Sequence, residues 1–69
     1  MNAATAIVEK FGGTRRLAAL SDVPASTIQS WKKAGVIPAQ RQTDILALAE
    51  EHGIGITPHD FFAPKDGAP

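Results

Sequence analysis

The stretch from residue 14 to residue 31 constrains the fold of this chain more than any other. It reads TRRLAALSDVPASTIQSW, and it predicts two short helices joined by a tight turn. Leu17 and Ala18 are expected to face inward from the first of these helices, and Val23 is expected to fill the turn. Ile28 and Trp31 are three residues apart, so they share one side of the second helix and pack against the first. Trp31 is therefore interpreted as a core residue.

The opposite side of the second helix carries no obligatory apolar residue. Its residues are Ala25, Ser26, Gln29 and Ser30. Helix-turn-helix proteins place the equivalent helix in the major groove of DNA, where such side chains reach the edges of bases. On a helix outside this two-helix pattern, the same residues would be interpreted as solvated surface. The pattern therefore makes this face a candidate DNA-reading surface.

The segment before this stretch predicts another helix. Four apolar residues follow the i, i+3, i+4, i+7 spacing of an amphipathic helix: Ala4, Ile7, Val8 and Phe11. Asn2 is its expected N-cap, and Gly12 and Gly13 are expected to end it. Thr14 is expected to cap the next helix, and Asp22 is expected to take a left-handed conformation in the turn.

Proline and glycine mark the ends of the later helices. Pro24 fits the first turn of the third helix, which runs to about Ala34 and is ended by Gly35. Pro38 suits the start of a fourth helix, and Gly53 ends it. The predicted inner face of this fourth helix holds Ile45, Leu48, Ala49 and His52.

The end of the chain predicts a connector and one more turn of helix. Residues 54–56 predict an apolar connector, and a strand is less favoured because no second strand-like run is present to pair with it. Thr57 and Pro58 are expected to begin a last turn that includes residues 60–62. The predicted fold is all-α, a compact bundle of four helices plus a short C-terminal helical turn, with a helix-turn-helix. One domain is expected over residues 1–62, followed by a flexible tail over residues 63–69.

Composition and charge narrow the class of protein. The chain has 69 residues and no cysteine, which fits one small domain without disulfides. It lacks a signal sequence and a long apolar run, so a soluble cytoplasmic protein is expected. The net charge is zero, but residues 1–41 hold six basic and two acidic side chains, whereas residues 42–69 hold one and five. The basic half contains the two-helix stretch, which favours phosphate contact over a chance segregation of surface charge.

With these pieces placed, the chain resembles a known group of proteins. It looks like the Cro-type repressors of lambdoid phages and the YdaS-like antitoxin family, within the lambda-repressor-like helix-turn-helix fold. The resemblance covers residues 7–62, and it is carried by FGGTRRLAAL, the turn with Val23, STIQSW, VIP at 36–38 and ITPHDFF. Two residues depart from the pattern. Ser21 stands where the family usually has a large apolar residue, and Asp22 stands where it usually has glycine.

The resemblance implies a small helical protein that binds operator DNA as a dimer. It implies that Thr14 touches a phosphate and that Thr27 lies beside the DNA backbone. The residues it places toward the bases are Ala25, Ser26, Gln29 and Ser30.

Among these residues, Gln29 is the strongest candidate for reading a base, because its amide can make a bidentate pair with adenine. Lys32 and Lys33 either neutralise phosphates or favour the negative end of their helix dipole, and both roles are compatible. Arg15 opposes the dipole of its own helix, which favours a phosphate role, although an ion pair with Glu9 or Asp22 is the alternative.

Other chemistry is not expected from this chain. His52 and His59 are seven residues apart, and no cysteine accompanies them, so they do not form a metal set. No residues suggest a catalytic triad, and a chain this small offers little pocket. We expect no enzyme activity, cofactor, metal or small-molecule ligand.

An apolar group near the C-terminus is a candidate dimer interface. It consists of Ile54, Ile56, Phe61 and Phe62. Phe61 and Phe62 point about 100° apart on a helix, so one can enter the core while the other stays exposed. A satellite cluster that closes the core is an equally weighted alternative.

The sequence therefore predicts a sequence-specific DNA-binding transcriptional regulator. A repressor is expected, bound as a homodimer to double-stranded DNA with its third helix in the major groove. The alternative is a protein-interaction module, such as an antitoxin or adaptor, that retains the helix-turn-helix fold. The acidic C-terminal half and the neutral total charge favour this alternative, whereas the basic first half favours DNA.

Overall fold

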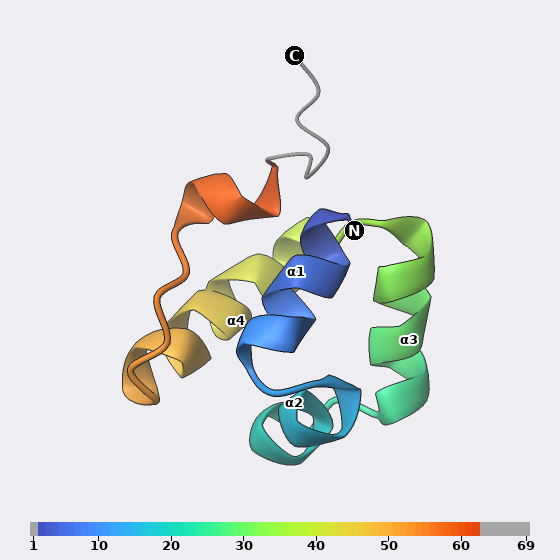
Figure 1. Ribbon diagram of the computed structural model, residues 1–69, viewed down its shortest axis with the longest axis horizontal. Helices are drawn as coiled ribbons and strands as arrows, with labels where there is room; N and C mark the ends of the chain where they lie inside the picture. The colour runs from blue at the N-terminus through green and yellow to red at the C-terminus, as the bar shows by residue number, and fades with distance from the viewer. Residues whose placement is uncertain (1, 63–69) are drawn as a thin grey trace.

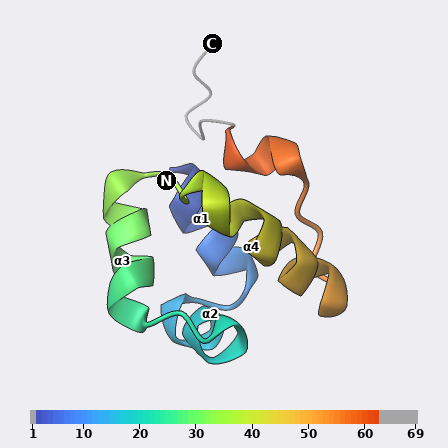
Figure 2. The same ribbon diagram turned by 180° about the vertical axis from the view of Figure 1, so that it is seen from behind.

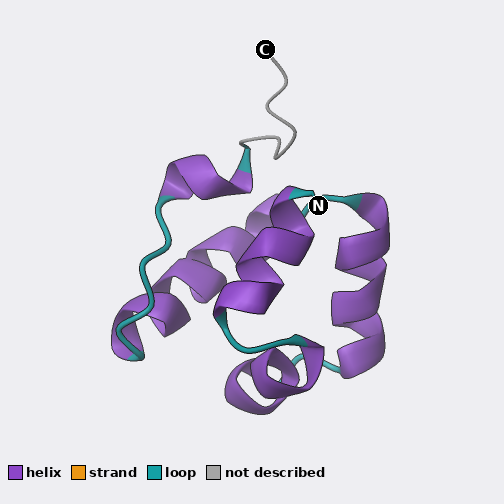
Figure 3. Ribbon diagram, viewed as in Figure 1, coloured by secondary structure: helices purple, strands orange, loops and turns teal. Residues whose placement is uncertain are grey.

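The computed structural model describes residues 2–62, which form four helices and one short 3-10 turn (Figure 1). The elements are α1 (Ala3–Lys10), α2 (Thr14–Ser21), α3 (Ala25–Ala34), α4 (Ala39–Glu51) and η1 (Pro58–Phe61). Figure 3 shows no strand in this part of the chain. The predicted all-α bundle of four helices with a C-terminal helical turn is confirmed, and residues 54–56 do not form the alternative strand. The predicted tail, residues 63–69, lies outside the described residues.

α1 lies near the middle of Figure 1 and packs against α2, α3 and η1. α3 packs against α1 and α2, and α2 also packs against α4. η1 packs against α1 and α4, on the other side of α1 from α3. None of the helices in residues 2–62 is long and apolar enough to cross a membrane.

The core contains apolar side chains from every element and from the turns. Its buried members are Ala4, Ile7, Val8, Phe11, Leu17, Val23, Ile28, Trp31, Ile37, Ile45, Ala49 and Phe61. The four positions predicted from the spacing of α1 are all among them, and so are Leu17, Ile28 and Trp31. Ala18, also predicted to face inward, is half-buried and packs against this core. Trp31 is only 4% exposed, which confirms its interpretation as a core residue. Leu48 is half-buried against this core, as expected for the inner face of α4.

The predicted inner face of α4 is wrong at its last position. His52 is exposed, although the 3.6-residue helical period predicted it on the buried side of α4 with Ala49. The helix ends at Glu51, and His52 is its C-cap residue, with backbone φ −102° and ψ 9°. Because His52 lies beyond the last helical residue, its side chain does not follow the helical spacing.

The start of α1 follows the sequence prediction, whereas α2 and α3 begin one residue away from it. Asn2 caps α1, and its Oδ1 accepts a 2.8 Å hydrogen bond from the Thr5 N–H. Thr14, the predicted cap of α2, is instead its first residue, and Gly13 is the N-cap with φ 111°. Glycine tolerates this conformation better than threonine does, which explains the shift. Pro24 is likewise the N-cap of α3 rather than a member of its first turn.

The turn between α2 and α3 has the conformation predicted for Asp22. Asp22 is left-handed, with φ 68°, and its N–H donates a 2.9 Å hydrogen bond to the Ala18 carbonyl. The Ser21 hydroxyl donates to the Leu17 carbonyl at 2.7 Å and accepts from the Val23 N–H at 3.2 Å. Ser21 therefore supports the turn with two hydrogen bonds, one donated and one accepted by its hydroxyl.

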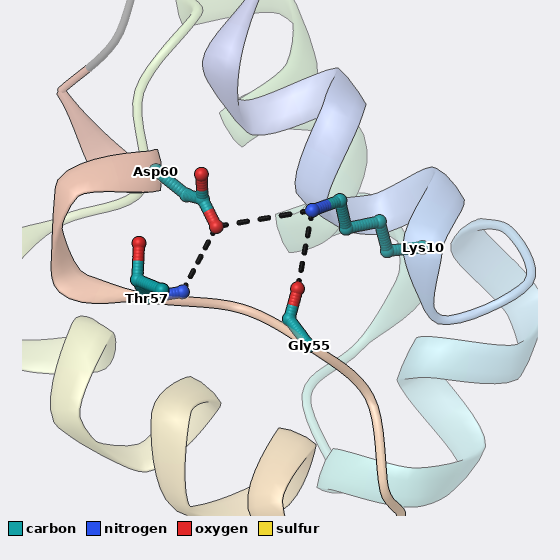
Figure 4. Close-up of polar contacts among 4 residues, drawn as sticks. All are labelled: Lys10, Gly55, Thr57 and Asp60. Carbon is teal, nitrogen blue, oxygen red and sulfur yellow. Dashed lines mark hydrogen bonds and ion pairs between the residues drawn. The ribbon is translucent and has the colours of Figure 1, made fainter.

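The C-terminal segment is fastened to α1 by polar contacts (Figure 4). Thr57 and Asp60 form a capping box at the start of η1, in which the Thr57 N–H donates to Asp60 Oδ2 at 2.9 Å. Lys10 Nζ lies 3.8 Å from the same Asp60 oxygen and donates to the Gly55 carbonyl at 3.1 Å. Lys10 therefore connects the end of α1 to a segment that is 45 residues away in the chain.

Candidate nucleic-acid interface

α3 lies at one edge of the molecule, with its neighbours on one side only (Figures 1 and 2). Ile28 and Trp31 are buried and hold this helix against α1 and α2. The opposite side of α3 carries the residues predicted to face DNA bases, and all of them are exposed: Ala25, Ser26, Gln29 and Ser30. Lys33 is exposed as well, and it lies one helical turn beyond Gln29. We call these five residues the outer row.

The outer row is free to meet a partner. No side-chain hydrogen bond or ion pair found within residues 2–62 engages any of its members. A shallow, open hollow of about 550 Å³ is lined by every member of the outer row except Ala25, and by Lys32. The hollow therefore presents two hydroxyls, one amide and two ammonium groups to solvent.

Thr14 and Lys32 meet where the start of α2 reaches α3. Both residues are half-buried, and Lys32 Nζ donates a 3.3 Å hydrogen bond to the Thr14 hydroxyl oxygen. The Lys32 carbonyl also accepts a 2.9 Å hydrogen bond from Asn2 Nδ2. The Thr14 hydroxyl proton and the remaining Lys32 ammonium protons stay available, so the pair can donate to one anion. Their contact, which the sequence analysis missed, joins two of the predicted phosphate-binding residues into one spot.

Arg15 and Arg16 are exposed in the first turn of α2. Neither forms an ion pair in the described part of the chain, where Lys10 and Asp60 form the one pair found. The alternative partners considered for Arg15, Glu9 and Asp22, therefore do not hold it. A positive charge at a helix N-terminus is mildly unfavourable without an anion nearby.

Neither α2 nor α3 has a side-chain cap at its N-terminus. At the start of α3, the Pro24 carbonyl accepts from Thr27 and Ile28, at 3.0 Å and 3.2 Å. Thr27 is half-buried in this first turn. Uncapped N–H groups at a helix start can donate to anions, and the positive end of the helix dipole adds to the attraction. Both helix starts are therefore suited to phosphate.

The predicted apolar patch near the C-terminus is divided between core and surface. Phe61 is 4% exposed and belongs to the core, whereas Phe62 is 69% exposed. Ile54 and Ile56 are half-buried, pack against the core, and line an open groove with residues of α4. The two phenylalanines therefore divide as expected, because Phe61 enters the core while Phe62 stays exposed.

His52 and His59 are both exposed. Within residues 2–62, no three His, Cys, Asp or Glu side chains gather in a way that could hold a metal ion.

Comparisons of this chain with protein-family models, with curated proteins and with solved structures find no match. The described residues form a small, compact, all-helical domain of four helices and one 3-10 turn. Any assignment of family or function must therefore come from the residues themselves.

Proposed function

We propose that this chain is a sequence-specific DNA-binding transcriptional regulator that places α3 in the major groove. The observation that carries the proposal is the outer row of α3, which is exposed, polar and unengaged while the opposite side of the same helix is buried. A helix that rests on a second helix and presents such a face fits the way helix-turn-helix proteins dock on DNA.

The surroundings of α3 support a contact with the DNA backbone. The Thr14–Lys32 pair, Arg15 and Lys33 supply donors and positive charge at the start of α2 and along α3. Contacts of this kind set the position of a protein on the duplex, and base contacts set its sequence preference. The zero net charge of the chain is compatible with DNA binding, because the basic residues are concentrated in the part of the chain that contains α2 and α3.

The finer assignments belong to the same proposal. The protein acts as a repressor in the cytoplasm, binds its operator as a homodimer, and carries out no catalysis. Its relatives are the Cro-type repressors and YdaS-like antitoxins, within the lambda-repressor-like fold, as the sequence resemblance implies.

A salt titration of DNA binding tests the proposal. Fluorescence anisotropy with a labelled random-sequence duplex should show binding at low salt, and log affinity should fall as log salt rises because counterions are released. Lys33→Ala should weaken binding to all sequences and reduce the slope by about one. Arg41→Ala is the matched control, because Arg41 is an exposed cation on α4, outside the outer row.

Two results would contradict the proposal. A wild-type protein that binds no duplex at low salt is not a DNA-binding regulator, and the protein-interaction module then becomes the favoured function. Equal slopes for the wild-type protein and for Lys33→Ala would remove Lys33 from the contact surface.

A further inference from the structure

We propose that α3 reads A·T base pairs, with Gln29 recognising adenine and Ala25 contacting the methyl group of thymine. The inference rests on the proposed DNA-binding function and names the DNA that the site selects. A guanine contact is confined to the end of the site that Lys33 faces.

The groups that read G·C pairs are missing from the middle of the outer row. Guanine presents two acceptors in the major groove, N7 and O6, which arginine or lysine matches with two donors. Cytosine presents a donor, its N4 amino group, which a carboxylate accepts best. α3 reads ASTIQSWKKA, and it contains no arginine, aspartate or glutamate. Its first two turns therefore offer neither kind of partner.

Among the first four residues of the outer row, Gln29 is the one whose side chain offers a donor and an acceptor side by side for a single base. Adenine presents an acceptor at N7 beside a donor at N6, and a glutamine amide offers a donor beside an acceptor. The Gln29 side chain is exposed and has no hydrogen-bond partner within residues 2–62. Its amide is therefore free to take the orientation that adenine requires.

Ala25 supplies the complementary apolar contact. It is exposed at the first position of α3, four residues before Gln29. Four residues span about 6 Å of helix, which corresponds to roughly two base-pair steps of 3.4 Å. A methyl side chain at this distance can contact a thymine methyl near the adenine. Ser26 and Ser30 can both donate and accept, so they add bonds without choosing between bases.

The lysines divide into two roles. Lys32 is half-buried and donates to Thr14, so its ammonium group is directed toward the start of α2. Lys33 is exposed, and it is the one cation in the outer row. It lies a full turn beyond Gln29, and contact with guanine is therefore limited to that end of the site.

Selection and base analogues test the inference. Selection from a random duplex library should return sites with A·T pairs at the centre of each half-site. Replacing the adenine assigned to Gln29 by 7-deazaadenine removes N7, one of the two bonding atoms, and should weaken binding about 2- to 13-fold. Replacing the thymine assigned to Ala25 by uracil removes one methyl group and should weaken binding about fourfold.

Variants at Gln29 then test which base that position reads. Gln29→Arg should move the preference at a single base position from adenine to guanine, and Gln29→Glu should move it toward cytosine. Both variants should fold as the wild-type protein does, as judged by circular dichroism, because the position is exposed. Gln40→Ala is the matched control, since Gln40 is an exposed glutamine on α4, and it should keep the wild-type profile.

The outcomes separate this inference from the proposed function. A G·C-rich centre, or a wild-type base profile in both Gln29 variants, overturns the A·T inference while salt-dependent DNA binding still stands. Full affinity for the 7-deazaadenine site likewise removes the contact between Gln29 and adenine. A protein that binds no duplex overturns the inference and the proposed function together.

Discussion

The α2–turn–α3 unit and the closing segment, residues 54–62, are held in place by different forces. Between α2 and α3, the contact is made by fully or nearly fully buried apolar side chains, among them Leu17, Ile28 and Trp31. The closing segment contributes one buried large side chain, Phe61, and two half-buried ones, Ile54 and Ile56, and it is also held by the polar contacts of Lys10 and Asp60 (Figure 4). The side chains of that ion pair are 45% and 32% exposed.

These two kinds of contact predict different local stabilities for the two regions. Burial of apolar surface is the dominant favourable contribution to folding, whereas exposed ion pairs contribute about 0–1 kcal/mol. The α2–α3 unit should therefore open only when the whole domain unfolds. The closing segment should open locally at a lower free energy. The proposed reading surface then rests on the more stable of the two regions.

The largest effect is expected inside the α2–α3 unit. Trp31→Ala should reduce the free energy of unfolding by about 3–5 kcal/mol, because the deletion leaves a large cavity. A domain of 69 residues has a total stability of roughly 3–10 kcal/mol, so this variant should be partly or fully unfolded. Urea denaturation followed by circular dichroism measures the loss.

The control for Trp31 comes from the other side of the same helix. Gln29→Ala should change the free energy of unfolding by less than about 0.5 kcal/mol, because Gln29 is exposed and unpaired within the described residues. A loss below about 1 kcal/mol for Trp31→Ala would show that the core does not depend on this side chain.

A smaller effect is expected in the closing segment. Phe61→Ala should cost about 3 kcal/mol, near the low end for an aromatic deletion, because a segment at the edge of the core can partly collapse onto the vacated space. Phe62→Ala is the adjacent control, and it should cost less than about 0.5 kcal/mol because Phe62 is largely exposed. Chemical denaturation of both variants measures the two changes in the free energy of unfolding. Equal changes would contradict the assignment of Phe61 to the core and Phe62 to the surface.

The smallest effect is expected for the polar contacts of the closing segment. Asp60→Ala removes the acceptor of the Thr57 N–H and the partner of Lys10, and it should cost about 1 kcal/mol, mostly through the lost cap. Amide hydrogen exchange should accelerate in residues 54–62 and stay unchanged in α3.

Asp44→Ala is the control for Asp60, since Asp44 is an exposed carboxylate on α4 without an ion pair in the described part of the chain. It should leave both the stability and the exchange rates unchanged. If Asp60→Ala accelerated exchange equally in both regions, the closing segment and the α2–α3 unit would open as one unit, and the comparison between them would fail.

Much of the candidate site was predictable because it depends on one helix. The spacing of Ile28 and Trp31 defines the buried side of α3, and the exposure of Ser26, Gln29 and Ser30 follows from it. The contact between Lys32 and Thr14 was not predictable. It depends on how α2 crosses α3, and these two residues are 18 positions apart.

The order of the elements, the turn at Asp22 and, except at His52, the inner faces of the helices follow from the sequence alone. These features obey local rules, namely the 3.6-residue period, the ends set by glycine and proline, and the few residue types that tolerate a positive φ. Tertiary packing alone explains why Phe61 is buried while Phe62 is exposed, and why Lys10 contacts Gly55 and Asp60. The choice between two neighbouring aromatic residues depends on where η1 meets α1 and α4. That meeting point is set by packing between distant parts of the chain, which no local pattern encodes.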